Sequence, residues 1–285
     1  MVYAPTRLRP DSNGLWRISR PRDKQAYVSI VICTYGRPDS LSVTLASLHS
    51  QTYKGFEVIL ITEKGNLSQL RQTGLEFAEG NVVAFIDDDV FCPETWLKSV
   101  VECFVKRPGV VGVTGPTEVT SEYRKNRDIF KYKRIKRLYN ALFLDSLGQQ
   151  PSYLSQVGAP STSSNDAGVS YNGRAGYLEA CNMAVRKRDA LSVGGFDRAY
   201  TGTSEWCEVD LALKLKTKGE LWYSQDAKLY HRPSKAGIYS ARLKTLHRWN
   251  NFITFQRRWV KPTFRARIYG VFIWVYLKMK SLQMI

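Results

Sequence analysis

The hydrophobic residues between positions 27 and 115 follow two alternating patterns. Runs of apolar, often β-branched residues of strand length recur at 27–33, 56–62, 82–86 and 110–113. Between these runs, apolar residues return every three or four positions, which is the helical period. Strands that are apolar on both faces and separated by helices predict a mostly parallel sheet covered on both sides. We therefore expect residues 27–115 to form a right-handed α/β unit.

The alternation stops after residue 115. A basic stretch with interleaved aromatic residues at 121–140 leads into a segment rich in Ser, Gly and Asn at 158–176, so we interpret 116–176 as an insertion with a mobile loop. Residues 177–238 again predict strands and helices, and residues 239–285 are helical, basic and aromatic in pattern. The expected organisation is a basic N-terminal arm at 1–26, an α/β domain at 27–238 and a basic helical C-terminal extension at 239–285.

The charge of the chain is concentrated in its appendages. The sequence has 42 Lys and Arg against 25 Asp and Glu, a formal net charge of +17. Residues 228–285 alone contain 13 basic residues and no acidic one, while the body of the chain is mildly acidic. Such a surface predicts an anionic partner: nucleic acid, acidic lipid or a phosphorylated substrate.

The cysteines and the apolar runs bear on the cellular compartment. Five cysteines without any CxxC pair argue against a disulfide framework or a zinc knuckle and fit a reducing compartment. The arginine-rich start lacks the apolar run of a secretory signal. The longest apolar run, 268–277, is half of the roughly 20 residues that a transmembrane helix needs. We expect a cytoplasmic protein.

Three successive carboxylates follow the strand at 82–86. Asp87, Asp88 and Asp89 are expected at the carboxyl edge of the sheet, where open α/β folds bind ligands. They repel one another unless a cation neutralises them, and a hard divalent ion held together with a substrate phosphate is the usual solution. The alternative is a solvated acidic turn that caps the next helix.

These carboxylates belong to a series of ordered sequence blocks. VSIVICTYGRPDSL, FEVILITEKG and LRQTGLEFAEGNVVAFIDDDV lie in the first half, and LEACNMAVRKRDAL, VGGFDRAY, SEWCEVDLALKLKTKG and KLYH lie in the second. Together they cover about 27–231 and resemble the inverting glycosyltransferases of family 2. The resemblance implies the GT-A fold, a Rossmann-like, mixed and mostly parallel sheet flanked by helices. Residues 27–115 would form its nucleotide-sugar half and residues 177–238 its acceptor half.

For the donor side, the resemblance implies a nucleotide-sugar held with Mn²⁺ or Mg²⁺. Asp87 and Asp89 would be the outer residues of the family's DxD motif, with Asp88 between them at the same site and with Asp89 and His231 as metal ligands. The remaining donor-binding positions would be Thr34, Tyr35, Arg37, Glu63 and Arg71. Glu63 departs from the Asp that the family usually places toward the base, which leaves the identity of the base open.

For the acceptor side, the resemblance matches Glu208 to the general base, and Glu205, one turn earlier, is the second candidate. A carboxylate near the anomeric carbon can take the proton of the acceptor hydroxyl as the new bond forms. Trp206, Asn182, Met183 and Asp210 would line the acceptor cavity. The structural alternatives are core or strand packing for Trp206, Asn182 and Met183, and complementation of the helix dipole for the acids.

The C-terminal extension allows three interpretations: a nucleic-acid surface, a membrane surface, or a helix that packs on its own domain. The apolar run at 268–277 is flanked by Arg265, Arg267, Lys278 and Lys280, which is typical of an element at an anionic headgroup layer. We favour the membrane surface and expect the donor site to survive truncation near residue 238, because every proposed donor contact precedes it.

The sequence therefore predicts a metal-dependent inverting glycosyltransferase, peripheral on the inner face of the cell membrane. Its expected reaction moves a sugar from a UDP-sugar to a glycan or lipid-linked acceptor in cell-surface polysaccharide synthesis. The alternative is a nucleic-acid-binding protein without catalysis, and the carboxylates at 87–89 argue against it because they would repel a phosphate backbone. A nucleotidyltransferase is less favoured, because TYGRPDS has a single Gly and a single Arg. Neither the particular sugar nor the oligomeric state follows from the sequence.

Overall fold

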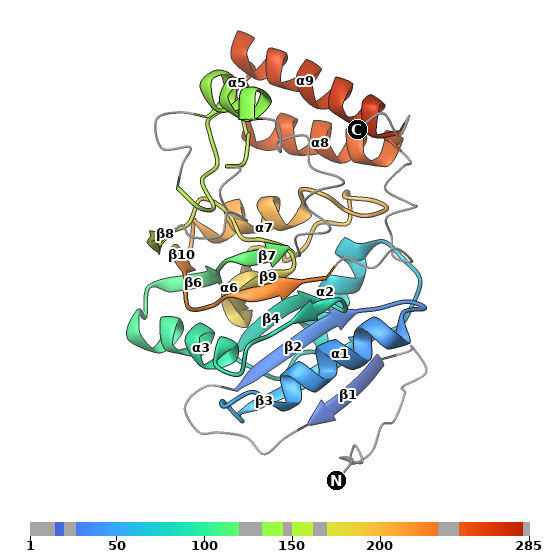
Figure 1. The fold of residues 1–285 in the computed structure, drawn as a ribbon, viewed down its shortest axis with the longest axis vertical. Helices are drawn as coiled ribbons and strands as arrows, with labels where there is room; N and C mark the ends of the chain where they lie inside the picture. Colours follow the sequence, from blue (N-terminus) through green and yellow to red (C-terminus); the bar gives the residue numbers. More distant parts are fainter. Residues whose placement is uncertain are drawn as a thin grey trace.

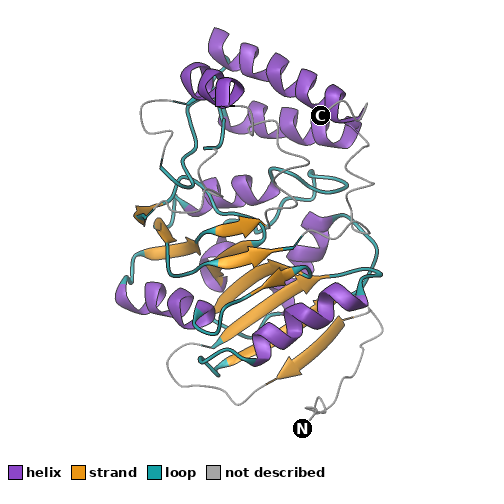
Figure 2. Cartoon of the chain, in the orientation of Figure 1, coloured by secondary structure: helices purple, strands orange, loops and turns teal. Residues whose placement is uncertain are grey.

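The structure, a computed structural model, describes residues 15–19, 27–119, 133–144, 150–161, 170–232 and 245–281. It is an α/β fold in which one large sheet carries helices on both faces (Figures 1 and 2). The helices are α1 (Pro38–His49), α2 (Leu67–Phe77), α3 (Trp96–Lys106), α5 (Lys133–Phe143), α6 (Lys187–Ser192), α7 (Cys207–Leu215), α8 (Thr245–Trp259) and α9 (Phe264–Ser281).

The large sheet contains eight strands in the described part of the chain. In spatial order they are β1 (Leu15–Ser19), β3 (Phe56–Ile61), β2 (Val28–Cys33), β4 (Val82–Asp87), β9 (Asn182–Arg186), β6 (Val110–Thr114), β10 (Glu220–Ser224) and β8 (Asn172–Arg174). β3, β2, β4, β6 and β10 point in one direction, whereas β1, β9 and β8 run against them. The predicted mixed, mostly parallel sheet is confirmed.

A second, small sheet brings distant segments to the carboxyl edge of the large one. Its strands are, in spatial order, β5 (Val90–Phe91), β11 (Leu229–His231) and β7 (Thr117–Val119). Because β11 pairs antiparallel with β5, His231 lies opposite Val90. The backbone N–H of Arg232 also donates to the carbonyl oxygen of Asp89 at 2.8 Å. This pairing places the end of β11 beside the acidic turn at 87–89.

The strands of the large sheet contribute side chains to two separate cores. Ile30 and Ile32 of β2 point to the core under α1 and α3, while Val31 points to the core under α2, α6 and α7. This alternation follows from the two-residue period of a strand. Burial of an aliphatic side chain of this kind contributes roughly 1.5–3 kcal/mol, which is why both faces of the sheet need helical cover.

The C-terminal extension is part of the folded core. In Figure 1, α5, α8 and α9 lie together at the end of the molecule opposite β1. Phe252 of α8 and Tyr269 of α9 pack in a third apolar cluster, and Phe255 of α8 reaches the core under α7. A chain cut near residue 238 would lose Phe255 and expose the core side chains that it covers, and survival of the donor site after such a cut stays a prediction.

Several elements differ from the sequence-based expectation. The basic arm supplies β1, an edge strand of the large sheet, and the rest of residues 1–26 lies outside the described residues. Helix α5 lies within 116–176. In the segment at 158–176, which we expected to be a mobile loop, Ala159 and Ala175 are buried and β8 pairs with the edge of β10. Backbone pairing compensates there for low hydrophobicity, and residues 162–169 lie outside the described part.

Candidate active site

The acidic turn lies where the parallel strands end. Asp87 is the last residue of β4, and Cys33 ends β2 beside it. Thr44 of α1, fully buried, holds the turn in place because its hydroxyl lies 2.9 Å from the carbonyl oxygen of Asp88 and 2.8 Å from that of Val90. In the sequence, the only sign of this support is that Thr44 falls on the same helix face as Leu41, Leu45 and Leu48. The turn is thus fixed by α1 as well as by its own strand.

Two of the three carboxylates converge with His231. One ligand atom each from Asp87, Asp89 and His231 lies within 4.8 Å of the others. His231 Nε2 is 3.0 Å from Asp89 Oδ1 and 3.9 Å from Asp87 Oδ2. The structure therefore brings together the residues assigned to the DxD ends and to the histidine ligand. A set of two carboxylates and one imidazole suits a divalent transition ion such as Mn²⁺ better than Mg²⁺, which prefers oxygen ligands.

Asp88 points into the protein instead of toward a ligand. Its side chain is fully buried and accepts a hydrogen bond of 2.6 Å from Thr34 Oγ1 and an ion pair from Arg37. Burial raises the pKa of Asp88 to about 6, although Thr34 and Arg37 act in the opposite direction. The prediction that Asp88 contacts the donor is corrected: the residue anchors the loop between β2 and α1.

The same contacts revise the roles of the loop residues. Thr34 is buried against Asp88, and Arg37 also pairs with Asp89 at 3.0 Å. These two side chains hold the carboxylates, and their contact with the donor stays a prediction. Tyr35 differs, since its ring is 62% exposed and is followed by Gly36 with φ of +67°, a conformation that favours glycine. Of the three predicted residues, Tyr35 is the one available to a base or ribose.

Arg71 connects the acidic turn to helix α7. Its guanidinium is buried, lies 3.5 Å from Asp87 and donates toward the Cys207 sulfur at 3.7 Å. The next residue, Glu208, is partly accessible in the first turn of α7. Burial raises the pKa of Glu208, with the Arg71 charge pulling it back toward its ordinary value. A carboxyl with a raised pKa is suited to accept a proton near neutral pH.

Glu205, the second candidate base, is already engaged. Its carboxylate pairs with Arg248 of α8 at 2.9 Å and accepts a hydrogen bond of 2.6 Å from Thr203. The neighbouring Trp206 has a φ of +76°, a strained conformation for a bulky residue, and stacks on Phe255 of α8 at a ring distance of 4.6 Å. Through these contacts Glu205 and Trp206 hold the start of α7 against α8. Because the Glu205 carboxylate is already used in this packing, Glu208 is favoured as the base.

Three predicted acceptor residues lie inside the protein. Asn182 is buried, accepts from Trp96 Nε1 at 3.1 Å and donates to the carbonyl oxygens of Pro116 and Ala227. Met183 packs in the core under α7. Asp210 is fully buried beneath α8 and accepts from Arg258 and Trp259, both at 2.7 Å. The acceptor assignment of Asn182, Met183 and Asp210 is corrected, because all three are structural.

Two further acidic residues, Glu63 and Glu179, lie near the carboxyl edge of the sheet. Glu63 is exposed on the loop after β3, as expected of a residue that could meet a base. Glu179 was missed by sequence reasoning: it precedes β9, accepts a hydrogen bond from Tyr177 at 2.8 Å and acts electrostatically on Glu208. Its acidic character was visible in the sequence, but its place depends on β9 running antiparallel beside β4.

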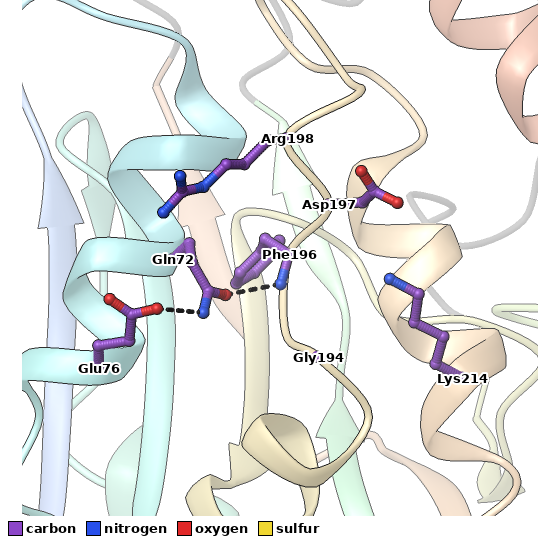
Figure 3. Close-up of a pocket in the computed structure, with 7 residues that line it drawn as sticks. All are labelled: Gln72, Glu76, Gly194, Phe196, Asp197, Arg198 and Lys214. Carbon is purple, nitrogen blue, oxygen red and sulfur yellow. Dashed lines mark hydrogen bonds between the residues drawn. The ribbon is translucent and has the colours of Figure 1, made fainter.

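A pocket of about 520 Å³ lies elsewhere, between α2 and α7 (Figure 3). Gln72 in this pocket accepts a hydrogen bond from the backbone of Phe196 and donates to Glu76. Lys214 is paired with Asp210, and Asp197 is paired with Arg258. None of the predicted site residues lines this pocket. It is therefore separate from the carboxyl edge of the sheet.

Comparison with known proteins gives the class. Residues 61–155 match the model of glycosyl transferase family 2. A glucosyl-dolichyl phosphate glucuronosyltransferase from Haloferax volcanii is 29% identical over 116 residues, which cover 31% of this chain and 37% of that enzyme. The match thus spans little more than a third of this relative.

Two solved structures share the fold. The mannosyltransferase PcManGT from Pyrobaculum calidifontis, in complex with GDP-Man and Mn²⁺, has a TM-score of 0.53 at 14% identity and covers 91% of this chain and 72% of its own. GalNAc-T7 with UDP, GalNAc and Mn²⁺ has a TM-score of 0.53 at 12% identity, over 75% of this chain and 45% of its own. The fold and the acidic edge define a GT-A protein. This chain is therefore similar to the family 2 glycosyltransferases over residues 61–155 and has the GT-A fold, which favours the enzyme over the non-catalytic alternative.

Proposed function

We propose that the protein transfers a sugar from a nucleoside-diphosphate donor to an acceptor hydroxyl by a metal-dependent, inverting displacement. The observation that carries this proposal is the convergence of Asp87, Asp89 and His231 at the carboxyl edge, with Arg71 linking Asp87 to the start of α7. A cation-binding group and a candidate base thus lie on either side of one buried arginine. That arrangement is what a single displacement at a sugar diphosphate requires.

On the donor side, Asp87, Asp89 and His231 would hold the metal ion. The ion, when bound, supplies positive charge to the departing diphosphate. Arg37 fixes the orientation of the Asp89 carboxylate through their 3.0 Å ion pair. The Asp89 side chain therefore does not have to be ordered when the metal ion binds. Tyr35, whose ring is exposed at the same edge, is placed to contact the nucleoside.

On the acceptor side, Glu208 takes the proton of the attacking hydroxyl. The new bond forms between the acceptor oxygen and the anomeric carbon as the bond from that carbon to the diphosphate oxygen breaks. The proton moves to the Glu208 carboxylate, and the diphosphate leaves with the bonding electrons. Because attack and departure occur on opposite faces of the sugar in one step, the anomeric configuration inverts.

The relatives support a nucleotide-sugar donor but differ in the base. PcManGT is described with GDP-Man and GalNAc-T7 with UDP. We propose a UDP-sugar for this chain. The Haloferax relative carries a lipid-linked sugar in its name, which supports a lipid-linked acceptor. We further propose that the acceptor is a glycan or lipid-linked glycan of cell-surface polysaccharide synthesis.

Donor screening tests the proposal directly. The full chain is incubated with a lipid-linked or glycan acceptor and with UDP-, GDP- and dTDP-sugars, each with Mn²⁺, with Mg²⁺ or with a chelator, and nucleoside diphosphate release is measured. We expect release from a UDP-sugar that stops with the chelator and returns with Mn²⁺. Proton NMR of the product then gives its anomeric configuration. Release that persists in the chelator overturns metal dependence, and a retained configuration overturns the single displacement.

A further inference from the structure

Helix α9 is apolar on two opposite faces. Its inner face includes Ala266, Tyr269 and Leu277, each at most 6% exposed, and Ala266 and Tyr269 pack in the third apolar cluster with α5 and α8. A helix that only closed a core would be polar on its other side. The inner face therefore explains why α9 is attached, and the outer face needs a separate explanation.

The outer face of α9 carries a stripe of exposed apolar side chains. These are Phe264 (79% exposed), Ile268 (41%), Val271 (63%), Trp274 (47%) and Val275 (41%). The steps of three or four residues from Phe264 through Ile268 and Val271 to Val275 place these four along one side of the helix, with Trp274 at its border. Scattered single apolar residues are ordinary on a protein surface, but a continuous stripe marks an interaction site. We call these five residues the α9 stripe.

Neighbouring helices extend the apolar character of this end of the molecule. Arg265 Nε of α9 donates to the carbonyl oxygen of Leu142 at 2.7 Å, which ties the end of α5 to the start of α9. Leu138 and Leu142 of α5 are 59% and 45% exposed. Between α8 and α9 there is also a small pocket of about 170 Å³, lined by Leu246, Trp249, Trp274, Leu277 and Lys278. The pocket joins the stripe at Trp274.

The charges around the stripe have one sign. Arg267 and Lys278 are exposed near its two ends, and Lys278 lies 5.7 Å from the centre of the Trp274 ring. Residues 228–285 contain 13 basic residues and no Asp or Glu. None of the helices that the structure describes is long and apolar enough to span a bilayer. The exposed side of α9 therefore combines aliphatic and aromatic side chains with cationic ones on a single helix.

We propose that the α9 stripe docks on the surface of an anionic lipid bilayer, with Arg267 and Lys278 at the headgroups. Charge complementarity selects this partner: a second copy of the chain would bring two cationic surfaces together, and nucleic acid offers no apolar layer for Ile268, Val271 and Val275. Anionic lipid is characteristic of the cytoplasmic leaflet, so the docked enzyme lies peripherally on the inner face of the cell membrane. Lipid-linked acceptors would be presented on the same surface.

Vesicle sedimentation with the full chain tests this proposal. The probes are vesicles of phosphatidylcholine mixed with phosphatidylglycerol, and vesicles of phosphatidylcholine alone. We expect binding to the anionic vesicles that weakens at high salt. Each of Arg267→Gln and Lys278→Gln weakens binding about fivefold, because a basic residue at the surface contributes about 1 kcal/mol.

The apolar half of the proposal is tested by Ile268→Ser together with Val271→Ser. Both side chains are exposed, so we expect the variant to keep the fold, and a melting temperature equal to that of the wild type is the check. The matched control is Val105→Ser on α3, where a valine with 54% exposure, between the 41% of Ile268 and the 63% of Val271, lies away from the stripe. We expect the stripe variant to lose the binding that persists at high salt and the control to keep it. Equal binding by both variants, tight RNA binding without vesicle binding, or a dimer that the stripe variant dissociates would each overturn the membrane assignment.

Discussion

The Asp210 carboxylate of α7 accepts a hydrogen bond of 2.7 Å from the indole nitrogen of Trp259, 49 residues further along the chain in α8. Arg258 and Lys214 pair with the same carboxylate, each at 2.7 Å. Helix α7 also begins at Cys207, next to the proposed base Glu208. The position of that base therefore depends on a helix of the C-terminal extension.

Arg258 pairs with both Asp210 and Asp197, and we predict that replacing the two aspartates lowers the free energy of unfolding by different amounts. Asp210→Ala leaves Arg258 and Lys214 facing an empty buried site, and we expect a loss of about 3–5 kcal/mol in the free energy of unfolding. Asp197→Ala removes a partly exposed partner of Arg258, and we expect a loss of about 1 kcal/mol or less. Urea denaturation measures both. Equal losses would show that the buried contact is not what holds α8 on α7.

The acidic turn predicts a loss of metal-dependent donor binding in Asp89→Ala. Removing one carboxylate from the group formed with Asp87 and His231 takes away a ligand and its pair with Arg37, while Arg37 keeps its pair with Asp88 and repulsion in the turn falls, so we expect the fold to be kept. Calorimetry of UDP binding with and without Mn²⁺ checks this, and Glu102→Ala, exposed on α3, is the control. An unchanged affinity for UDP with Mn²⁺ in the Asp89 variant would contradict the metal assignment.

The two candidate bases are separated by a pair of amide substitutions. We expect Glu208→Gln to lower turnover by roughly 10²–10⁴-fold with little change in donor affinity, because a general base contributes about that factor. Glu205→Gln loses its pair with Arg248 and should mainly lower stability. Initial rates and donor affinity are measured for both variants. If Glu205→Gln is the inactive one, the assignment of the base moves one turn along the chain.

The raised pKa of Glu208 predicts the acid side of the pH profile. The base acts in its ionised form, so activity falls as the pH drops below the pKa of Glu208, and burial places that point above the ordinary value for a glutamate. The midpoint of kcat/KM against pH in the wild type is the measurement. Glu208→Gln should lose this acid limb from its residual activity. An acid limb that survives in the variant belongs to another group.

The sequence was sufficient for the parts of the fold that depend on local pattern. The strands β2, β3 and β4 are apolar on both faces, so their alternation with helices was visible directly. The edge strand β1 was missed, because its five residues acquire a strand partner only when β3 is present. Helix α5 was missed because basic residues mask its pattern, although Tyr139 and Phe143 share one buried face.

The predicted site divides in the same way. Asp87 and Asp89 were visible as acids at the end of a predicted strand, whereas the metal role of His231 was implied by the resemblance of KLYH to the family. Asp210 was misassigned, since its partners Arg258 and Trp259 lie in a distant helix that the sequence pattern does not connect to it. Buried polar residues and exposed site residues look alike in a sequence, and only tertiary packing distinguishes them.

Strand β9 has a consequence for how the protein is made. It pairs with β4 on one side and with β6 on the other, yet it is synthesised about 70 residues after β6. Until residue 186 has left the ribosome, β4 and β6 both present open, apolar edges, and such edges are prone to pair with other chains. The segment 27–115 expressed alone is therefore an aggregation hazard, and a soluble fragment of this enzyme has to extend through β9.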